Sequence, residues 1–248
     1  MNARPRISFV VPAYNEEVLL PACLEAILAE IERSGVESEL IVVNNASTDR
    51  TAEVALKFPS VILVQQPIKG LVQARSAGFE ASTGELVANI DADTILPVGW
   101  IDRMLAEFAR DPELVAVSGP YDYYDVPFRI RAAARIFYIV GFATYSFNRF
   151  VLRVGSMVQG GNFVVMRDAL LRAGGFDQTF TFYGEDTDIA RRMNKVGRVK
   201  FTWALMAKSS GRRLRGDGLV MTGVRYSANY LWATFFRKPF TDAWNDYR

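Results

Sequence analysis

The sequence predicts an α/β fold built on a mostly parallel, doubly wound sheet. Short runs rich in β-branched residues alternate with stretches of helical periodicity through the first half of the chain, which is the rhythm of βαβ units. Polar clusters also follow directly after three of these runs, where such sheets bind ligands. The expected strands are 7–11, 40–43, 61–64, 86–90 and 114–117, and the expected helices are 17–32, 51–57, 71–81 and 100–110.

Each of the three strands that precede a polar cluster is almost entirely apolar. The first, ISFVV, leads into PAYNE; the second, LIVV, leads into NNASTD; and the fourth, LVANI, leads into DAD. Because parallel strands end at the same edge of a sheet, we expect the three clusters to meet there and form one site.

The next region, 127–154, is a long helical stretch with a basic edge. Its longest uncharged run, 136–148, is too short to span a bilayer, which needs about 20 apolar residues. The pattern fits an interfacial membrane helix, and equally a buried amphipathic helix with a solvated arginine edge. The arginines that fall on one side of an ideal helix are Arg131, Arg135, Arg149 and Arg153, beside Phe137, Ile139, Val140, Phe147 and Phe150.

Charge is distributed unevenly along the chain. Residues 191–248 carry 13 Lys+Arg against 3 Asp+Glu, whereas the rest of the chain carries 16 against 24. This excess predicts an anionic partner near the C-terminus, or a solvated basic face. Residues 224–240 mix aromatic and basic side chains, which favours peripheral contact with a membrane. We therefore expect amphipathic helices in a basic, aromatic tail, 216–248.

The absence of histidine restricts the chemistry of this 248-residue chain. Ser-His-Asp triads, Cys-His pairs and imidazole metal ligands are excluded, so proton transfer must use carboxylates and a metal must be bound by oxygen. Its single cysteine, Cys23, cannot form an internal disulfide, and the N-terminus lacks a signal-peptide pattern. We expect one large globular domain in the cytoplasm.

Asp91 and Asp93 stand on one turn directly after an apolar strand. Two carboxylates so spaced can face one divalent cation, Mg²⁺ or Mn²⁺, and a nucleotide diphosphate can supply the remaining oxygen ligands. Aspartates are also common in turns after strands, so the pair alone does not distinguish a metal site from an ordinary turn.

Four motifs in one order carry a more specific signal. They are 10–16 (VVPAYNE), 91–93 (DAD), 160–162 (GGN) and 184–186 (GED). In these motifs the sequence resembles the family 2 glycosyltransferases, which have the Rossmann-like GT-A fold, over roughly residues 7–215. The resemblance implies a catalytic domain at 1–215, with the helix 127–154 inserted, followed by the tail 216–248.

The resemblance also implies where a nucleotide-sugar donor binds. Asp93 would be the direct metal ligand, and Asp91 would reach the ribose or the metal through water. Arg75 would approach the diphosphate, unless it is an ordinary arginine of a helix surface. The amides that replace the family's usual acidic residues at 44–45 leave the nucleobase open. The other residues implied for the nucleotide are Pro12, Ala13, Tyr14, Glu16, Asn44, Asn45 and Lys69. Those implied near the transferred sugar and the acceptor are Gly160, Gly161 and Asn162, although a β-bulge or a turn would also explain the glycines.

Asp186 matches the family's catalytic base, with Glu185 supporting it. Acidic residues at the start of a helix also complement its dipole, so a structural role is the alternative. Arg212 and Arg213 stand where many relatives carry a glutamine-arginine-tryptophan motif or a metal-binding histidine; they would bind the diphosphate, or form a solvated loop. The resemblance implies direct displacement with inversion at the anomeric carbon.

Two other functions stay open. A nucleotidyltransferase shares the α/β layout, but normally carries a glycine-rich, basic loop where this chain has PAYNE. A non-catalytic protein at a membrane surface could bind a lipid carrier or another transferase. A dinucleotide oxidoreductase is disfavoured because no Gly-x-Gly-x-x-Gly follows the first strand. The expected partners are a nucleotide sugar and a saccharide or polyprenyl-linked acceptor, at the inner face of the plasma membrane, and no nucleic acid.

Overall fold

The computed structural model describes residues 6–147, 157–180, 184–216, 218, 221–223 and 232. Some predictions therefore lie outside the described residues. These are the predictions for Arg149, Phe150 and Arg153, for the end of the helix 127–154, and for most of the tail 216–248.

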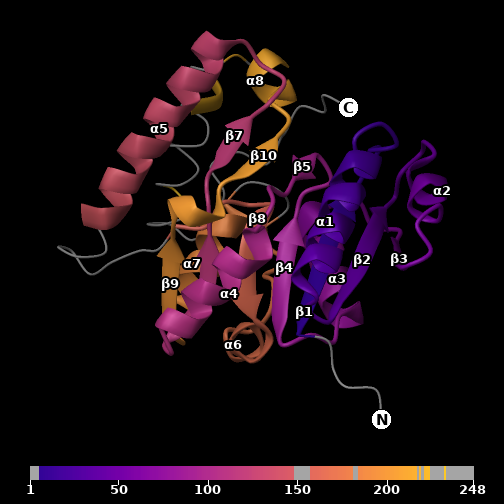
Figure 1. Ribbon diagram of the computed structural model, residues 1–248, viewed down its shortest axis with the longest axis horizontal. Helices are drawn as coiled ribbons and strands as arrows, with labels where there is room; N and C mark the ends of the chain where they lie inside the picture. The colour runs from indigo at the N-terminus through magenta and orange to yellow at the C-terminus, as the bar shows by residue number, and fades with distance from the viewer. Residues whose placement is uncertain are drawn as a thin grey trace.

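A seven-stranded sheet forms the centre of the described chain (Figure 1). Its order is β3-β2-β1-β4-β8-β6-β9, and neighbours are parallel except at β8, which is antiparallel to both β4 and β6. The predicted, mostly parallel sheet is confirmed. The strands are β1 Ile7–Ala13, β2 Ser38–Asn45, β3 Val61–Gln66, β4 Leu86–Ile90, β6 Leu114–Ser118, β8 Asn162–Met166 and β9 Arg198–Phe201.

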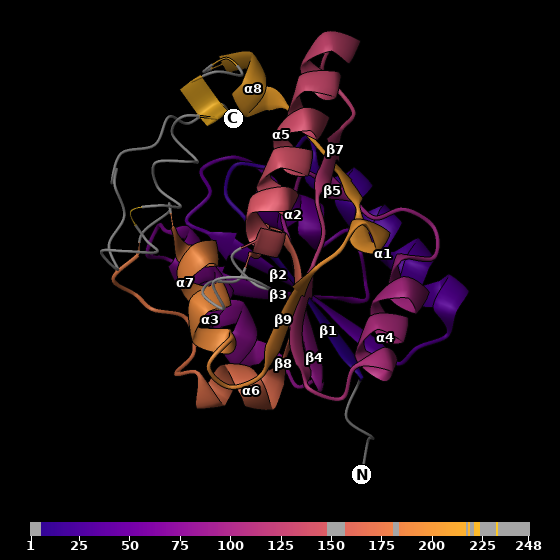
Figure 2. The same cartoon turned by 90° about the vertical axis from the view of Figure 1, so that its left-hand side faces the viewer.

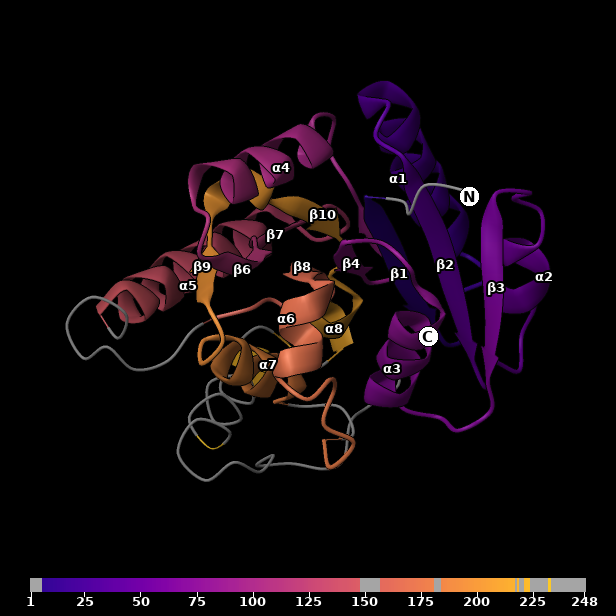
Figure 3. The same cartoon turned by 90° about the horizontal axis from the view of Figure 1, so that it is seen from below.

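Helices cover both faces of this sheet (Figure 3). α1 and α4 pack on one face, whereas α3, α6 and α7 pack on the other; α2 lies at the β3 edge. The predicted helices 71–81 and 100–110 agree with α3 and α4 at both ends. The helices are α1 Leu20–Ser34, α2 Thr51–Ala55, α3 Leu71–Ala81, α4 Trp100–Arg110, α6 Arg167–Arg172 and α7 Glu185–Met193.

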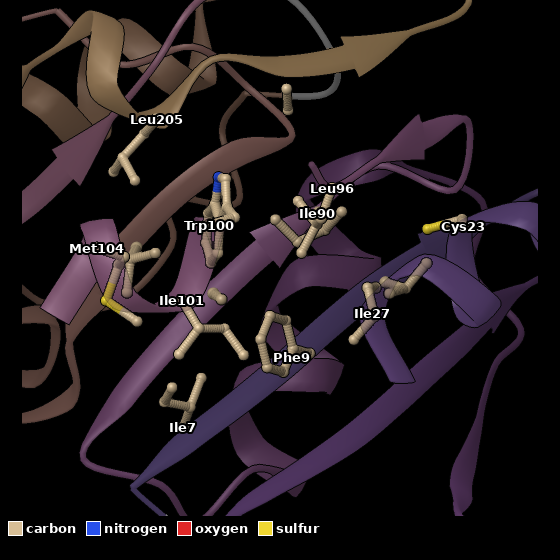
Figure 4. Close-up of a cluster of buried hydrophobic side chains, with 14 of the residues drawn as sticks. Ile7, Phe9, Cys23, Ile27, Ile90, Leu96, Trp100, Ile101, Met104 and Leu205 are labelled. Carbon is tan, nitrogen blue, oxygen red and sulfur yellow. The ribbon is translucent and has the colours of Figure 1, made fainter. Parts of the chain in front are cut away.

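The apolar core under α1 and α4 is shown in Figure 4. Phe9 of β1 and Trp100 of α4 are fully buried, with ring centroids 6.2 Å apart. Val10, the next residue of β1, instead faces the second core, under α3 and α7. Because successive side chains of a strand point to opposite faces, a strand covered on both faces must be apolar throughout. This explains why β1 was predictable from sequence.

A second, smaller sheet has the order β5-β10-β7. It joins the segment directly after Asp93 to the segment directly before Arg212. Its strands were not predicted, because strands of two or three residues cannot show an alternating pattern. The elements of this region are β5 Thr94–Ile95, β7 Tyr121–Tyr123, the 3-10 helix η2 Trp203–Leu205, β10 Ala207–Ser209 and α8 Arg212–Gly216.

The long helix α5 (Phe128–Phe147) extends away from the main sheet (Figures 1 and 2). Arg135 is exposed and its Nη2 pairs with Asp122 Oδ2 at 3.1 Å, so the predicted arginine edge includes an ion pair. Large apolar residues are exposed on this helix as well, beside the exposed Arg129 and Arg135. We define the α5 apolar face as the exposed residues Phe128, Ile136, Ile139 and Val140. Within the described part of the chain, no helix is both long and apolar enough to cross a membrane.

Candidate active site

The loops after β1 and β2 are hydrogen-bonded to each other at one edge of the sheet. The backbone N–H of Asn15 donates to Ser47 Oγ (3.0 Å), and that of Thr48 donates to Asn15 Oδ1 (2.8 Å). The backbone N–H of Glu16 donates to Thr51 Oγ1 (2.8 Å). Asn15 has a φ of 50°, in the left-handed region that asparagine tolerates better than most residues. The predicted meeting of these two polar clusters is confirmed.

Three of the residues implied for the nucleotide lie at the end of β1. Pro12 and Ala13 are buried in the last two positions of the strand. Tyr14 follows at the surface of the loop, and Lys69 Nζ lies 3.9 Å from the centroid of its ring. This cation–π contact joins the β1 loop to the segment before α3.

The two amides at the end of β2 contact protein groups. Asn45 donates from Nδ2 to the Ile68 carbonyl (2.6 Å) and accepts from the Gly70 N–H (2.8 Å), so it shapes the loop before α3. Asn44 donates from Nδ2 to Gln65 Oε1 at 2.7 Å. Its Oδ1 is buried and has no hydrogen-bond partner in the described part of the chain.

Arg75 lies inside the protein, beneath the acidic residues. Its side chain is 0% exposed, so the interpretation as a helix-surface arginine is wrong. Its guanidinium contacts Glu185 Oε1 through Nη1 and Asp91 Oδ1 through Nη2, the latter at 3.2 Å. A buried arginine needs such partners, because an unpaired charge inside a protein is very unfavourable. Arg75 therefore links the cluster after β4 to the start of α7.

Gly161 lets the carboxyl group of Asp91 lie directly against the backbone. A Cβ at Gly161 would overlap that carboxyl group, and the residue has a φ of 79°. Gly161 also accepts a hydrogen bond from the Asp91 N–H (3.0 Å). Both the close approach and the left-handed backbone require glycine here.

Gly161→Ala is expected to displace Asp91 and to weaken metal and donor binding, with about 1–3 kcal/mol of lost stability. Gly174→Ala is the matched control, because Gly174 has a similar φ of 87° but open space around its Cβ position. Calorimetry of ligand binding and urea unfolding separate the two effects. Equal loss of binding in both variants would contradict the role given to the Asp91 contact.

Asp186 and Glu185 begin α7 with different environments. Glu185 is buried, and its Oε1 contacts Arg75. Burial raises the pKa of Glu185 to about 7, although the nearby guanidinium of Arg75 acts to lower it. Asp186 is only partly buried; its Oδ1 accepts from the Thr187 N–H (2.8 Å), and burial raises its pKa as well. A Cβ at Gly160 would lie 3.6 Å from Asp186 Oδ2 and 3.2 Å from Glu185 Oε1. Asp186 is therefore the more accessible carboxylate.

Asp93 and Glu16 share a single guanidinium. Arg212 Nη1 donates to Glu16 Oε2 (3.0 Å), and Nη2 contacts both Glu16 Oε1 and Asp93 Oδ2, the latter at 3.1 Å. Burial raises the pKa of Asp93 to about 6, against the attraction of Arg212. The neighbouring Arg213, also implied for the diphosphate, is partly buried at the start of α8.

The donor groups fit a hard divalent cation. Asp91 and Asp93 offer carboxylate oxygens on one turn. The Asp93 carboxylate is largely buried, so little water stabilises its negative charge, and a bound cation would stabilise that charge instead. Over the described residues, no group of three or more acidic, cysteine or histidine side chains could hold a metal by itself. A ligand such as a diphosphate would have to complete the coordination shell.

Asn162 faces the interior. Its side chain is fully buried, and Nδ2 donates to the carbonyls of Gly119 (3.0 Å) and Leu205 (2.7 Å). It thus ties the start of β8 to the ends of β6 and η2. A direct role in sugar binding stays a prediction.

Asp125 and Tyr121 also contact segments of the site, although no sequence motif indicated either residue. Asp125 Oδ2 accepts from Ser210 Oγ (2.7 Å) and Asp125 Oδ1 from the Gly211 N–H (2.5 Å), which anchors the segment that carries Arg212. Tyr121 donates from its hydroxyl to the Gly160 carbonyl at 3.0 Å. These contacts join residues 39 or more positions apart, so no local pattern could have indicated them.

A hollow of about 380 Å³ opens elsewhere, on the outer side of the small sheet. Its walls include Val98, Trp203 and Lys208 but none of the clustered carboxylates. Alternate residues of a strand point to opposite faces, so Lys208 lies on the side away from Ser209, whose Oγ contacts Asp93 Oδ1 at 3.4 Å. We therefore keep the carboxylate cluster as the candidate active site.

A family model described as Glycosyl transferase family 2 matches residues 8–174, more than half of the chain. The chain belongs to glycosyltransferase family 2. The matched range contains Arg75, Asp91 and Asp93, together with the strands β1 to β8, and it ends before Glu185 and Arg212. The predicted family is confirmed.

Individual relatives of this family 2 chain agree with that assignment. The Bacillus subtilis protein named "Probable glycosyltransferase YdaM" is 25% identical over 89% of this chain and 57% of its own length. Dolichyl-phosphate beta-glucosyltransferase ALG5D of Trichomonas vaginalis is 39% identical over 46% of this chain and 38% of its own length. The chain therefore spans little more than half of the length of one relative and less than two fifths of the length of the other.

A solved structure has the same fold. Mannosyltransferase PcManGT from Pyrobaculum calidifontis, in complex with GDP-Man and Mn²⁺, superposes with a TM-score of 0.65. The two chains are 24% identical, and the match covers 89% of this chain and 63% of that one. The predicted GT-A type of fold is confirmed.

Proposed function

We propose that this chain transfers a sugar from a nucleotide-diphosphate sugar to an acceptor by one inverting displacement. The observation that carries the proposal is the pair of adjacent glycines, Gly160 and Gly161, with Asp186 beside the first and Asp91 beside the second. The absence of side chains at the two glycines lets both carboxylates lie close to one stretch of backbone. The buried Arg75 contacts Asp91 on one side and Glu185, the neighbour of Asp186, on the other. An acceptor and a donor sugar could meet beside these two carboxylates.

Asp186 acts as the base in this proposal. Its carboxylate takes the proton of an acceptor hydroxyl, the acceptor oxygen bonds to the anomeric carbon, and the bond from that carbon to the diphosphate oxygen breaks. Attack opposite the leaving group inverts the anomeric centre. Partial exposure of Asp186 supports this role, whereas Glu185, tied to Arg75, positions the start of α7.

Asp93 and Asp91 would hold Mg²⁺ or Mn²⁺. Such an ion neutralises negative charge on the departing diphosphate. In this proposal Arg212 and Arg213 bind phosphate oxygens, and Tyr14, Asn44, Asn45 and Lys69 bind the nucleoside. The solved neighbour with Mn²⁺ and a guanosine-diphosphate sugar supports a metal and a nucleotide sugar as the ligand classes.

The acceptor proposed is lipid-linked, a polyprenyl phosphate or a saccharide on such a lipid, at the inner face of the plasma membrane. The relative named for dolichyl phosphate supports this class, and the α5 apolar face offers a surface for peripheral membrane contact. A soluble saccharide is the alternative acceptor.

Sedimentation with anionic liposomes at low salt tests the membrane contact. Ile136→Asp, in the α5 apolar face, should abolish sedimentation. Leu56→Asp is the matched control, because Leu56 is similarly exposed at the end of α2, which lies on the opposite side of the molecule from α5 (Figure 1). Failure of the unchanged protein to sediment would remove the support for a lipid acceptor.

Release of nucleoside diphosphate from UDP-, GDP- and dTDP-sugars, with Mn²⁺ or with EDTA, tests the proposed function. Metal-dependent release that is lost in Asp93→Ala and Asp186→Asn would support it and name the donor. A nucleotidyltransferase would instead form pyrophosphate from a nucleoside triphosphate and a sugar phosphate. Absence of release and of metal-dependent donor binding across the panel would favour a non-catalytic protein at a membrane surface.

The pH dependence of kcat should report a base of raised pKa. A protonated carboxyl cannot accept the acceptor's proton, so kcat should fall as the pH is lowered. Because burial raises the pKa of Asp186, the midpoint should lie above the ordinary value for aspartate, about 3.9. Glu185, whose pKa is about 7, titrates beside it, so the profile belongs to the pair. A rate that increases on acidification would contradict the assignment.

A further inference from the structure

Arg212 contacts a carboxylate oxygen of Asp93 that a divalent cation would use. Its guanidinium makes two contacts with Glu16 and one with Asp93 Oδ2, at 3.1 Å. All three side chains are largely buried, with 16% of Arg212, 3% of Glu16 and 14% of Asp93 exposed. The ion pairs are therefore shielded from solvent, and an exposed surface pair would be far weaker.

The backbone around Arg212 is held in place by a separate anchor. Asp125 accepts hydrogen bonds from Ser210 and Gly211, and its carboxylate pairs with Arg215 Nη2 at 3.1 Å. The Arg215 Nη1 also donates to the Asp125 carbonyl at 2.8 Å. α8 thus starts at a fixed position, above β10 in Figure 1, and only the Arg212 side chain needs to move to release Asp93.

We propose that Arg212 is an internal counter-ion which keeps a divalent cation from binding well until a nucleotide diphosphate binds with it. This inference rests on the proposed function, because it takes Asp93 as a metal ligand. A guanidinium beside Asp93 and a divalent cation on Asp93 repel each other, and they compete for the same carboxylate. The metal alone must therefore break the contact between Arg212 and Asp93.

A diphosphate changes this competition. Its oxygens accept paired hydrogen bonds from a guanidinium, so Arg212 can exchange Asp93 for phosphate while its contact with Glu16 persists. Asp93 is then free for the cation, which in turn binds the same diphosphate. Binding of metal and binding of nucleotide are thereby coupled, and each raises the affinity for the other by the same factor.

Titration of the whole protein with Mn²⁺, followed by the electron paramagnetic resonance of free Mn²⁺, tests this coupling without any turnover. Mn²⁺ is added alone, and again with GDP or UDP as the probe nucleotide. In Arg212→Gln the affinity for Mn²⁺ alone should rise about tenfold or more, and the further gain from nucleotide should shrink, because the coupling is lost.

Two control variants separate the effect of a cation beside Asp93 on Mn²⁺ affinity from the effect of the overall charge of the protein. Arg212→Lys keeps a cation at the site and should bind Mn²⁺ alone as weakly as the unchanged protein. Lys208→Gln removes one positive charge from the outward side of β10 and should not alter Mn²⁺ affinity. Thermal unfolding of each variant, with and without Mn²⁺, checks that the fold is retained.

The outcomes distinguish this inference from the proposed function. If Mn²⁺ binds with nucleotide but Arg212→Gln binds Mn²⁺ alone no better than the unchanged protein, the counter-ion role is wrong and the transferase proposal stands. Equally tight binding of Mn²⁺ with and without nucleotide in the unchanged protein would also overturn it. If no form binds Mn²⁺ under any condition, the metal-dependent function fails, and the inference fails with it.

Discussion

With an acceptor that reacts through a hydroxyl group, Asp186→Asn is expected to lower kcat by about 10²–10⁴-fold, the usual contribution of a positioned general base. Asparagine has the shape of aspartate and can still accept the hydrogen bond from the Thr187 N–H, so α7 should begin as before. The amide cannot take a proton from the acceptor. Donor affinity, measured by calorimetry, should therefore stay unchanged while steady-state transfer falls.

Asp168→Asn is the matched control, because Asp168 is an exposed aspartate in the first turn of α6 and lies outside the carboxylate cluster. Its kcat should not change. A loss in Glu185→Gln with no loss in Asp186→Asn would contradict the assignment and make Glu185 the base.

The size of the Asp186→Asn effect should also depend on the acceptor. A lipid phosphate is already ionised near neutral pH and does not need a base, whereas a saccharide hydroxyl does. A large loss of kcat with a saccharide acceptor and a small loss with a polyprenyl phosphate would show that Asp186 acts as a base only for saccharide acceptors.

Most of the first half of the fold could be predicted from the sequence, because its central strands β1, β2 and β4 are buried on both faces. Strands such as β1 and β2 are apolar runs bounded by turn residues, and α3 and α4 agree with their predicted bounds. β8 could not be predicted in the same way. This strand lies between β4 and β6 and is antiparallel to both. Neither of its partners is adjacent to it in the sequence. Such pairing depends on contacts across the sheet, which no local pattern carries.

The candidate site was predictable only in part, for a similar reason. The acidic residues follow strands or begin a helix, so their positions are visible in sequence order. The resemblance named Arg75 and Arg212 for the diphosphate, but it did not indicate their ion pairs with these acids: Arg75 contacts a carboxylate 110 residues away, and Arg212 contacts one 196 residues away. The residues next to each arginine in the sequence would equally suit an arginine on a solvated helix surface. Only the fold shows that both side chains are largely buried among carboxylates.

Arg75→Met is expected to lower the free energy of unfolding by about 3–5 kcal/mol, since it removes one partner of a buried ion pair and leaves the other charge uncompensated. Glu185 would lose its partner for Oε1, and Asp91 would lose its contact at 3.2 Å. Methionine fills similar space, so a cavity is not the main cause. Urea unfolding at neutral pH measures the loss.

Arg110→Met is the matched control, because Arg110 is exposed and lies 3.9 Å from Glu107; it should change stability by less than about 1 kcal/mol. Adding Glu185→Gln to Arg75→Met should restore part of the lost stability by removing the buried charge.

The loss of stability in Arg75→Met should also be smaller at acidic pH. Burial raises the pKa of Glu185 and Arg75 acts to lower it, so this pKa should rise further in Arg75→Met. The folded state then binds the proton of Glu185 more tightly than the unfolded state does. The free energy of unfolding therefore falls as the pH increases from the unfolded-state pKa of Glu185 towards its folded-state pKa. A loss that is the same at acidic and alkaline pH, with no recovery in the double variant, would mean that Arg75 stabilises the fold through packing alone.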